Sequence, residues 1–229
     1  MPMKLRLLLL AVLLLTNCFL FSQCSRQEEP AEGAPLVTFE LDWRAVDPQF
    51  YTISIDSAGR ASYCSEPRTE AGETPGDPYL LKFTADPRDT AEIFRFAEQL
   101  NYFEGKFDNL GKKVAQTGIK TLRYRDGKKQ NSTDYNASTN PKLNQITSLF
   151  QRMSSTFELA RTLQNELRYD KLGLDETLKR MEELQRSGQL AELQAVAPTL
   201  SQIADDSTVM GVARQRARRL LSVSTVATK

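Results

Sequence analysis

The sequence predicts an α+β fold, with a small antiparallel sheet packed against helices and a long helix leading into an α-helical C-terminal extension. Through most of residues 36–135, apolar and polar residues alternate, which is the period of strands with one buried face. After residue 140, apolar residues recur every three or four positions, which is the period of amphipathic helices. Strands grouped before helices favour α+β over α/β. We therefore expect an α+β domain over residues 36–161 and a helical extension over residues 162–222.

The first half of the domain reads as four strands joined by turns. The segment Asp56-Ser57-Ala58-Gly59 has turn composition and predicts a hairpin between the second and third strands. Residues 66–78 contain three prolines and two glycines and are expected to form a loop. The four strands are predicted at residues 37–42, 51–55, 60–64 and 79–84.

A helix and a second hairpin are expected next. Asp86 can cap the helix, because its carboxylate can accept a hydrogen bond from a backbone N–H of the first turn. Pro87 suits the first helical position, because the backbone N–H that proline lacks has no helical partner there. The pair Asp126-Gly127 lies between two alternating segments, residues 119–124 and 128–135. Since Asp-Gly suits a type I′ turn, these segments predict a hairpin.

Four helices are predicted after residue 140. The longest begins at Asn140-Pro141 and ends near Arg168, a length of about 40 Å at 1.5 Å per residue. We expect its first half to cover the sheet and its second half to project beyond it. Asp175 is the predicted cap of the second helix, Gly188 separates the second from the third, and Asp205-Asp206-Ser207 is the predicted start of the last. Residues 223–229 are expected to be a frayed tail.

The N-terminus has the parts of a secretory signal. Lys4 and Arg6 precede an apolar run over residues 7–15, and cysteines follow at positions 18 and 24. The stretch over residues 25–35 is polar and rich in Pro and Gly, which predicts a flexible linker. We therefore expect residues 1–24 to be a signal peptide and the rest of the chain to act outside the cytoplasm.

Three kinds of processing fit this signal, and each brings the chain to a membrane or across it. In the first, a bacterial lipoprotein signal is cut before Cys24, or before Cys18, and the cysteine carries lipid. In the second, ordinary cleavage uses Ser22 and Cys24 as the small residues that flank the cut. In the third, residues 5–21 remain as an anchor, although 17 residues are fewer than the roughly 20 that span a bilayer. Cys24 is the preferred lipid-attachment residue, because the polar linker starts directly after it.

Composition excludes several classes of protein. Removing residues 1–24 takes away two of the 30 basic residues and none of the 29 acidic ones, leaving a net charge of about −1 (28 minus 29). A nucleic-acid binder would need a strong basic excess. The chain has no histidine, which excludes Ser-His-Asp and Cys-His catalysis and histidine-ligated metal sites within it. We expect no cofactor, no metal and no catalytic set.

The cysteines leave two alternatives open. Three cysteines without a Cys-x-x-Cys pair do not form the usual zinc or iron–sulfur framework. If Cys24 carries lipid, Cys64 is a lone thiol. If Cys24 carries none, a Cys24–Cys64 disulfide can form in an oxidising compartment.

Basic residues gather around the Asp126-Gly127 hairpin. They are a candidate contact for acidic lipid head groups or an anionic envelope polymer. The alternative is a solvated hairpin edge whose charges prevent aggregation. The candidate residues are Lys112, Lys113, Lys120, Arg123, Arg125, Lys128 and Lys129.

Residues 50–161 resemble a family of exported bacterial domains of unknown function. The resemblance lies in the strand Phe50–Ile55 with its Asp/Gly turn, Tyr63 in the next strand, the aromatic stretch Leu100–Phe103 and the helix start Asn140-Pro141. It implies export and supplies no catalytic residues. Many members carry paired cysteines near the first strand, whereas this chain has one cysteine there. Residues 190–221 look like one HEAT-type helical hairpin, and a single copy cannot form a solenoid.

Together these features predict a non-catalytic protein of the bacterial cell envelope. We expect it to be exported, lipid-anchored in the periplasm or on the cell surface, and to act as an interaction or scaffold module with an envelope protein partner. The alternative is a periplasmic or surface enzyme, or an enzyme inhibitor, with a carboxylate- or thiol-based site.

Overall fold

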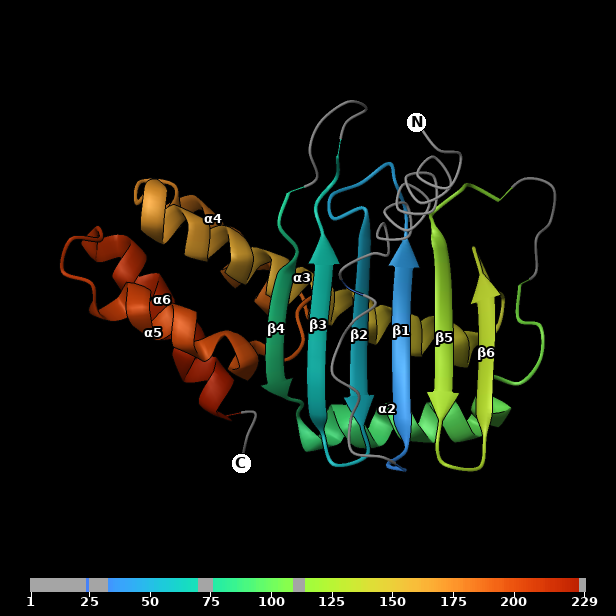
Figure 1. The fold of residues 1–229 in the computed structure, drawn as a ribbon. Coiled ribbons are helices and arrows are strands. Elements are labelled where there is room, and N and C mark those ends of the chain that lie inside the picture. Colours follow the sequence, from blue (N-terminus) through green and yellow to red (C-terminus); the bar gives the residue numbers. More distant parts are fainter. Residues whose placement is uncertain (1–23, 25–32, 70–75, 109–113, 227–229) are drawn as a thin grey trace, which may run out of the picture.

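A six-stranded antiparallel sheet forms the centre of the molecule (Figure 1). The computed structural model describes residue 24 and residues 33–69, 76–108 and 114–226. The strand order is β4-β3-β2-β1-β5-β6, so β1 lies inside the sheet between β2 and β5. The strands are β1 (Leu36–Asp42), β2 (Phe50–Asp56), β3 (Arg60–Glu66), β4 (Tyr79–Thr84), β5 (Ile119–Arg125) and β6 (Gln130–Tyr135).

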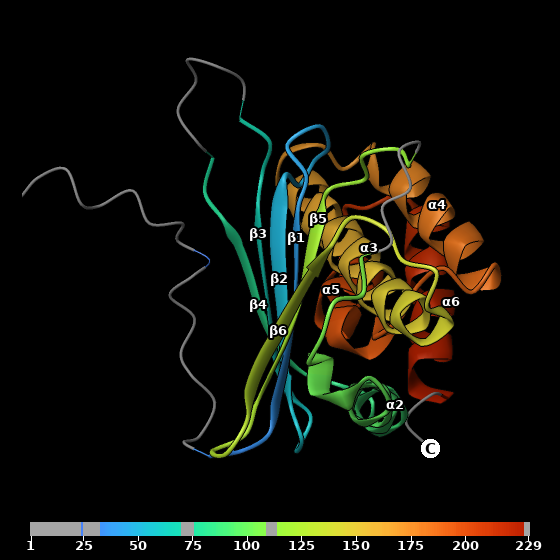
Figure 2. The ribbon, with the colours of Figure 1, turned by 90° about the vertical axis from the view of Figure 1, so that its right-hand side faces the viewer.

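The sheet carries its described helices on one face (Figure 2). Alternate side chains of each strand point to this face, and in β1 these are Val37, Phe39 and Leu41, which are buried. In β2 the buried residues Ile53 and Ile55 pair with Phe39 and Val37, so the apolar residues of the two strands lie side by side. The apolar residues of the predicted alternation therefore lie on the face that the helices cover, and the polar residues lie on the opposite face, which we call the open face.

Helix α2 (Pro87–Gln99) runs across one end of the sheet. As predicted, Asp86 is its N-cap and accepts a hydrogen bond from the backbone nitrogen of Arg88 at 2.7 Å. A short 3-10 turn, η2 (Asn101–Phe103), follows the helix. All three of its residues have positive φ angles of 49 to 65°, which non-glycine residues rarely adopt. This turn buries Phe103 in the core.

Helix α3 (Pro141–Tyr169) crosses the covered face from β6 toward β4. Phe150 stacks on Phe39 of β1 with ring centroids 5.1 Å apart. Phe157 contacts Tyr63 of β3 at 5.0 Å and Phe83 of β4 at 4.8 Å. The prediction that the second half of this helix projects beyond the sheet is therefore wrong for the start of that half, around Phe157, because the helix crosses the strands and does not run along them.

The C-terminal extension lies beside β4 and packs against the end of α3. Helix α4 (Leu174–Arg186) begins after Gly173. Asp175 therefore lies in its first turn, and the prediction that Asp175 caps this helix is wrong. The segment after it splits into a 3-10 turn, η3 (Leu193–Val196), and helix α5 (Ala197–Asp205).

The last helix, α6 (Gly211–Val226), differs from its prediction at both ends. Asp206 does not start the helix. Its carboxylate accepts from the backbone nitrogen of Thr208 at 2.8 Å and pairs with Lys171 at 2.7 Å, which holds residues 206–208 in a turn. At the other end the helix continues to Val226, so the frayed tail predicted from residue 223 is helical over four residues. Residues 227–229 lie outside the described part.

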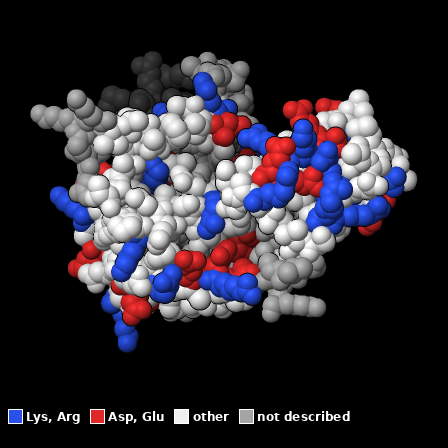
Figure 3. All heavy atoms as spheres, turned by 180° about the vertical axis from the view of Figure 1, so that it is seen from behind, with Lys and Arg blue, Asp and Glu red and all other residues white. Residues whose placement is uncertain are grey.

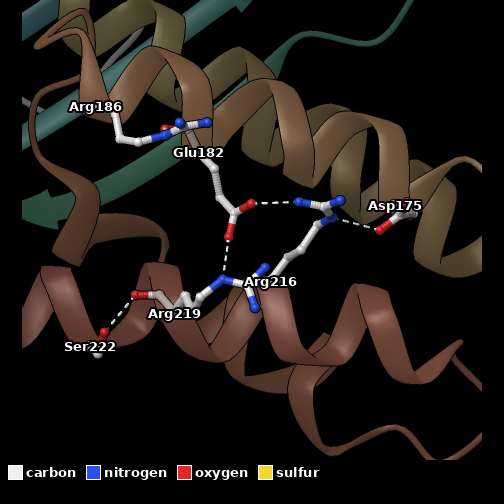
Figure 4. Close-up of polar contacts among 6 residues, drawn as sticks. All are labelled: Asp175, Glu182, Arg186, Arg216, Arg219 and Ser222. Atoms are coloured by element: carbon white, nitrogen blue, oxygen red, sulfur yellow. Dashed lines mark hydrogen bonds and ion pairs between the residues drawn. The ribbon is translucent and has the colours of Figure 1, made fainter.

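An ion-pair network joins α6 to α4 (Figure 4). Arg216 pairs with Asp175 at 2.7 Å and with Glu182 at 2.6 Å, and Glu182 also accepts from Arg219 at 2.7 Å. Charges of both signs lie intermixed over this extension (Figure 3). Such mixed, mutually paired charge is typical of a solvated helix surface that holds two helices in register.

Candidate functional site

The open face of the sheet has a disulfide on β3, the strand next to the edge strand β4. Cys24 is bonded to Cys64 of β3, with Cα atoms 5.5 Å apart. Tyr63 donates a hydrogen bond to Glu158 of α3 and so points to the covered face, which places its neighbour Cys64 on the open face. The backbone nitrogen of Cys24 also donates to the carboxylate of Glu66 at 3.4 Å. The end of the predicted signal segment is thus tied covalently to the sheet.

The structure has the second of the two alternatives for Cys24, the disulfide with Cys64. One sulfur atom cannot carry both a lipid thioether and a disulfide, so lipid attachment at Cys24 and this bond exclude each other. Lipid attachment at Cys24 stays a prediction. Cys18, the other candidate for acylation, lies outside the described residues, as does most of the linker predicted over residues 25–35. That linker joins Cys24, held on β3, to the start of β1.

Rows of polar side chains cross the open face around the disulfide. Thr38 and Ser54 share a hydrogen bond at 3.0 Å, and Thr121 donates to Asp134 at 2.7 Å. Strand register places one row at Thr38 and the next at Glu40. The first row contains Lys82, Ser62, Ser54, Thr38, Arg123 and Ser132, and the second contains Leu80, Cys64, Thr52, Glu40, Thr121 and Asp134. This face is hydroxyl-rich and mixed in charge, and Thr52, Cys64 and Thr121 of the second row are buried.

The predicted basic contact does not form one patch. Lys120 is buried, which contradicts its place in an exposed patch. Its ammonium donates to the carbonyl oxygens of Thr117, Gly118 and Asn136, at 2.9 to 3.2 Å, and to the Thr117 hydroxyl. Desolvation lowers the pKa of this amine. Lys120 fastens the segment before β5 to the end of β6, a role that the sequence did not indicate.

The other candidate basic residues are dispersed. Arg123 forms an ion pair with Glu40 on the open face. The ammonium of Lys129 lies 3.6 Å from the centre of the Tyr102 ring, which is a cation–π contact. Lys128 lies in the hairpin turn, and Arg125 is the last residue of β5 before it. Lys112 and Lys113 lie outside the described residues. Among the described residues of this set, Arg123 is in an ion pair, Lys129 contacts an aromatic ring and Lys120 is buried.

A groove of 920 Å³ opens between the β2–β3 turn and helix α2. Its walls are mostly apolar and include Phe94 of α2, Tyr102 of η2 and Tyr124 of β5. The hydroxyl of Thr90 also lines it and has no hydrogen-bond partner among the described residues. The volume is in the range of small-molecule sites, which are about 300–1,000 Å³.

A second cavity, of 240 Å³, lies where the helical extension meets α2. Glu192 lies at its wall, only 4% exposed, and its carboxyl accepts hydrogen bonds from the backbone nitrogen of Asp86 at 3.0 and 2.9 Å. Asp89 and Arg152 line the same cavity. Sequence reasoning missed this cluster, because Glu192 stands in an amphipathic stretch where a glutamate normally faces solvent.

Comparison with known proteins adds no relative. No protein-family model matches the chain, and no curated protein matches it significantly in sequence. The resemblance to exported domains of unknown function and to a HEAT-type hairpin therefore stays a prediction. Within the described ranges, no cluster of three or more cysteine or acidic side chains is arranged to hold a metal ion. The helices in those same ranges also lack the combination of length and apolar character needed to cross a bilayer.

Proposed function

We propose that this protein is an exported, membrane-tethered and non-catalytic module of the cell envelope, which presents the open face of its sheet to a partner. The observation that carries the proposal is the Cys24–Cys64 disulfide. Disulfides form and persist in oxidising compartments and are rare in the cytosol. Cys24 directly follows the signal-like segment, so its pairing with a strand of the domain agrees with delivery of the chain through an export route.

The disulfide also bears on how the chain is tethered. Cleavage after Cys24 would remove the cysteine that the bond needs, so this proposal keeps Cys24 in the mature chain. Two forms of tether remain, namely acylation of Cys18 or retention of residues 5–21 as an anchor. Cys24 lies six positions after Cys18, a distance of at most about 20 Å when the chain is extended. Either tether would therefore keep the sheet close to the bilayer surface.

The open face supports the part of the proposal that concerns interaction. It presents two rows of hydroxyl, carboxylate and basic side chains on a six-stranded platform, with Thr38 and Glu40 near its middle. Polar, mixed-charge surfaces of this kind suit non-obligate partners, whose interfaces are about as polar as the rest of a protein surface. No histidine is present to support the common hydrolytic or metal-dependent chemistries.

Fractionation of native cells tests the proposal. The full chain and its Cys18→Ser variant would be expressed at native level and followed into soluble and membrane fractions, with intact-mass analysis of each. We expect the full chain in the membrane fraction and, if Cys18 is acylated, a soluble Cys18→Ser variant. If both proteins stay in the membrane at full length, the anchor form holds. Recovery of the unmodified full chain from the cytosol would refute the proposal.

A carboxylate-based enzyme is the second candidate, because Asp89 and Glu192 meet beside a cavity. Two carboxyl groups with unequal proton affinity can serve as acid and base. Glu192, however, is buried and accepts three hydrogen bonds from the protein, which leaves little of it for a substrate. Hydrolysis of envelope polysaccharide or peptide by the purified chain, with loss in Glu192→Gln, would establish this candidate. If the purified chain hydrolyses none of these substrates, the enzyme candidate is rejected and the first proposal stands.

A further inference from the structure

Glu192 joins the helical extension to the sheet domain. It lies in the loop between α4 and η3, and its backbone is left-handed, with φ of 59° and ψ of 37°. The same carboxyl that accepts twice from the backbone nitrogen of Asp86 also accepts from the side-chain amide of Gln194. The bonds to Asp86 connect positions 106 residues apart in the chain. A left-handed glutamate is held only where its surroundings require that conformation, and here the requirement is docking onto the start of α2.

A second carboxyl group faces Glu192. Asp89, in the first turn of α2, lines the same 240 Å³ cavity, and its charge acts on the Glu192 carboxyl. Two carboxyl groups can share a hydrogen bond only while one of them keeps its proton. The pKa of the Glu192 carboxyl is raised to about 8, mainly by burial, and the nearby charge of Asp89 contributes to this rise. Burial also raises the pKa of Asp89.

The charged groups around the pair come from two elements. On α2 they are Asp86, Arg88 and Glu92, and on α3 the guanidinium of Arg152 lowers the pKa of Asp89. The parts of α4 and α6 that line the cavity are uncharged and comprise Gln185, Val223 and Ser224. Two cations, Arg88 and Arg152, thus lie near the pair together with the acids Asp86 and Glu92, and burial is the main cause that favours retention of one proton.

We propose that the Asp89–Glu192 pair is a proton-controlled latch, which holds the α4–η3 loop firmly against α2 while the pair keeps its proton and loosens its hold as the pH rises. When the loop opens, the carboxyl groups return to water and to ordinary acidity, near 4. At a pH between these two pKa values, the closed form keeps a proton that the open form has released. The equilibrium therefore shifts toward the open form as the pH rises through this interval. This inference does not rest on the proposed function.

The sign and range of the effect follow from this linkage. Between about pH 5 and pH 8, the opening equilibrium should rise by up to about tenfold per pH unit. Below that range both forms are protonated, and above it both are ionised, so the equilibrium should become independent of pH.

Hydrogen exchange measured by mass spectrometry tests the latch in the folded full chain. Protection factors, which are corrected for intrinsic exchange, would be measured from pH 5 to pH 9 for the peptide over residues 188–196 and for β2. For the loop peptide we expect at least a tenfold fall between pH 5.5 and pH 7.5 and a plateau above pH 8. For β2 we expect no such change. A loop whose protection does not depend on pH would overturn the proposal.

Variants assign the effect to the pair. Glu192→Gln cannot ionise, so its loop protection should stay constant with pH, and Glu166→Gln, which removes a carboxyl of raised pKa elsewhere, should behave like the unmodified chain. If Glu192→Gln fails to fold, Asp89→Asn serves as the test variant. Because it removes the neighbouring charge, the fall in the loop protection factor between pH 5.5 and pH 7.5 should be at least threefold smaller. A fall unchanged in Glu192→Gln, or in Asp89→Asn, would refute the latch.

Discussion

Removal of the Cys24–Cys64 disulfide should destabilise the domain by several kilocalories per mole. The bond joins residues 40 positions apart, and it restricts the unfolded chain while leaving the rest of the sheet unchanged. In the chain-entropy treatment, closing a loop of this length lowers the entropy of the unfolded state by about 13 cal/mol/K, or about 4 kcal/mol at 25 °C. The native state also loses freedom in the linker, so we expect about 3 kcal/mol.

The chosen perturbation is Cys24→Ser, because it leaves the β3 residue Cys64 in place; both cysteines are buried, so a hydroxyl at either position adds a desolvation penalty of its own. Urea unfolding of the purified chain, followed by circular dichroism, gives the free energy of unfolding with and without reductant. The unmodified chain should lose about 3 kcal/mol on reduction, whereas Cys24→Ser should have lost this already and should not respond to reductant. Cys18→Ser serves as the matched control and should respond as the unmodified chain does.

The entropy argument fails if oxidised unmodified chain and Cys24→Ser unfold at the same urea concentration. It fails equally if thiol titration of the unfolded, oxidised chain finds Cys24 and Cys64 both reactive. A loss of less than about 1 kcal/mol would indicate that residual structure in the unfolded chain already holds these segments together.

Three further perturbations follow from the contacts inside the domain. Tyr63→Phe removes the hydroxyl that donates to Glu158 at 2.7 Å and should lower the unfolding free energy by about 1–2 kcal/mol in urea titrations. Lys120→Met leaves three buried carbonyl oxygens without their donor and should cost about 2 kcal/mol, while binding to anionic vesicles should not change because the ammonium is buried. Desolvation of Glu182 raises its pKa, but hydrogen bonds from two α6 arginines outweigh it and hold the pKa below its usual value. Glu182→Gln should therefore cost about 1 kcal/mol at pH 7, and this difference should vanish as the pH falls below about 4.

Matched controls separate these effects from general sensitivity to substitution. Tyr169→Phe changes an exposed tyrosine, and Lys128→Met changes a lysine at the β5–β6 turn. Both should leave the free energy of unfolding within about 0.5 kcal/mol of the unmodified value. A Tyr63→Phe or Lys120→Met variant as stable as its control would contradict the hydrogen-bond assignments. An effect of Glu182→Gln that persists at pH 3 would contradict the ionic origin of its contribution.

The strands and the starts of α2 and α3 could be predicted from the sequence, because each depends on local chemistry. The strand Leu36–Asp42 alternates at period two, and Asn140 caps α3 by accepting from the backbone nitrogens of Lys142 and Leu143. These signals lie within a few residues of the element that they define. The predicted α+β class is confirmed for the same reason.

The errors arise where a distant contact overrides a local pattern. Lys120 looks like one charge of a basic hairpin, but its ammonium finds the carbonyl oxygen of Asn136, 16 residues away, and is buried. Asp206 looks like a helix cap, but Lys171 and Thr208 hold its carboxylate in a turn before α6 begins. Neither partner can be identified before the helices and strands are placed in space.

The candidate site was the least predictable part. Glu192 owes its burial and its left-handed backbone to docking against Asp86, and nothing in the stretch Leu190–Leu193 indicates either property. The Cys24–Cys64 bond was foreseen only as one of two alternatives, because spacing does not bring a linker cysteine to a strand. Only the sheet register, which places Cys64 on the open face, makes the pairing intelligible.

The measurement that bears most directly on export is disulfide mapping of the native protein. Cells would be quenched with acid and alkylated without reductant, and the protein would then be digested and analysed by mass spectrometry. We expect one peptide pair linked through Cys24 and Cys64, recovered with the cell envelope. Recovery of both cysteines in alkylated form, on a chain that still begins with Met1 and fractionates with the cytosol, would contradict the account.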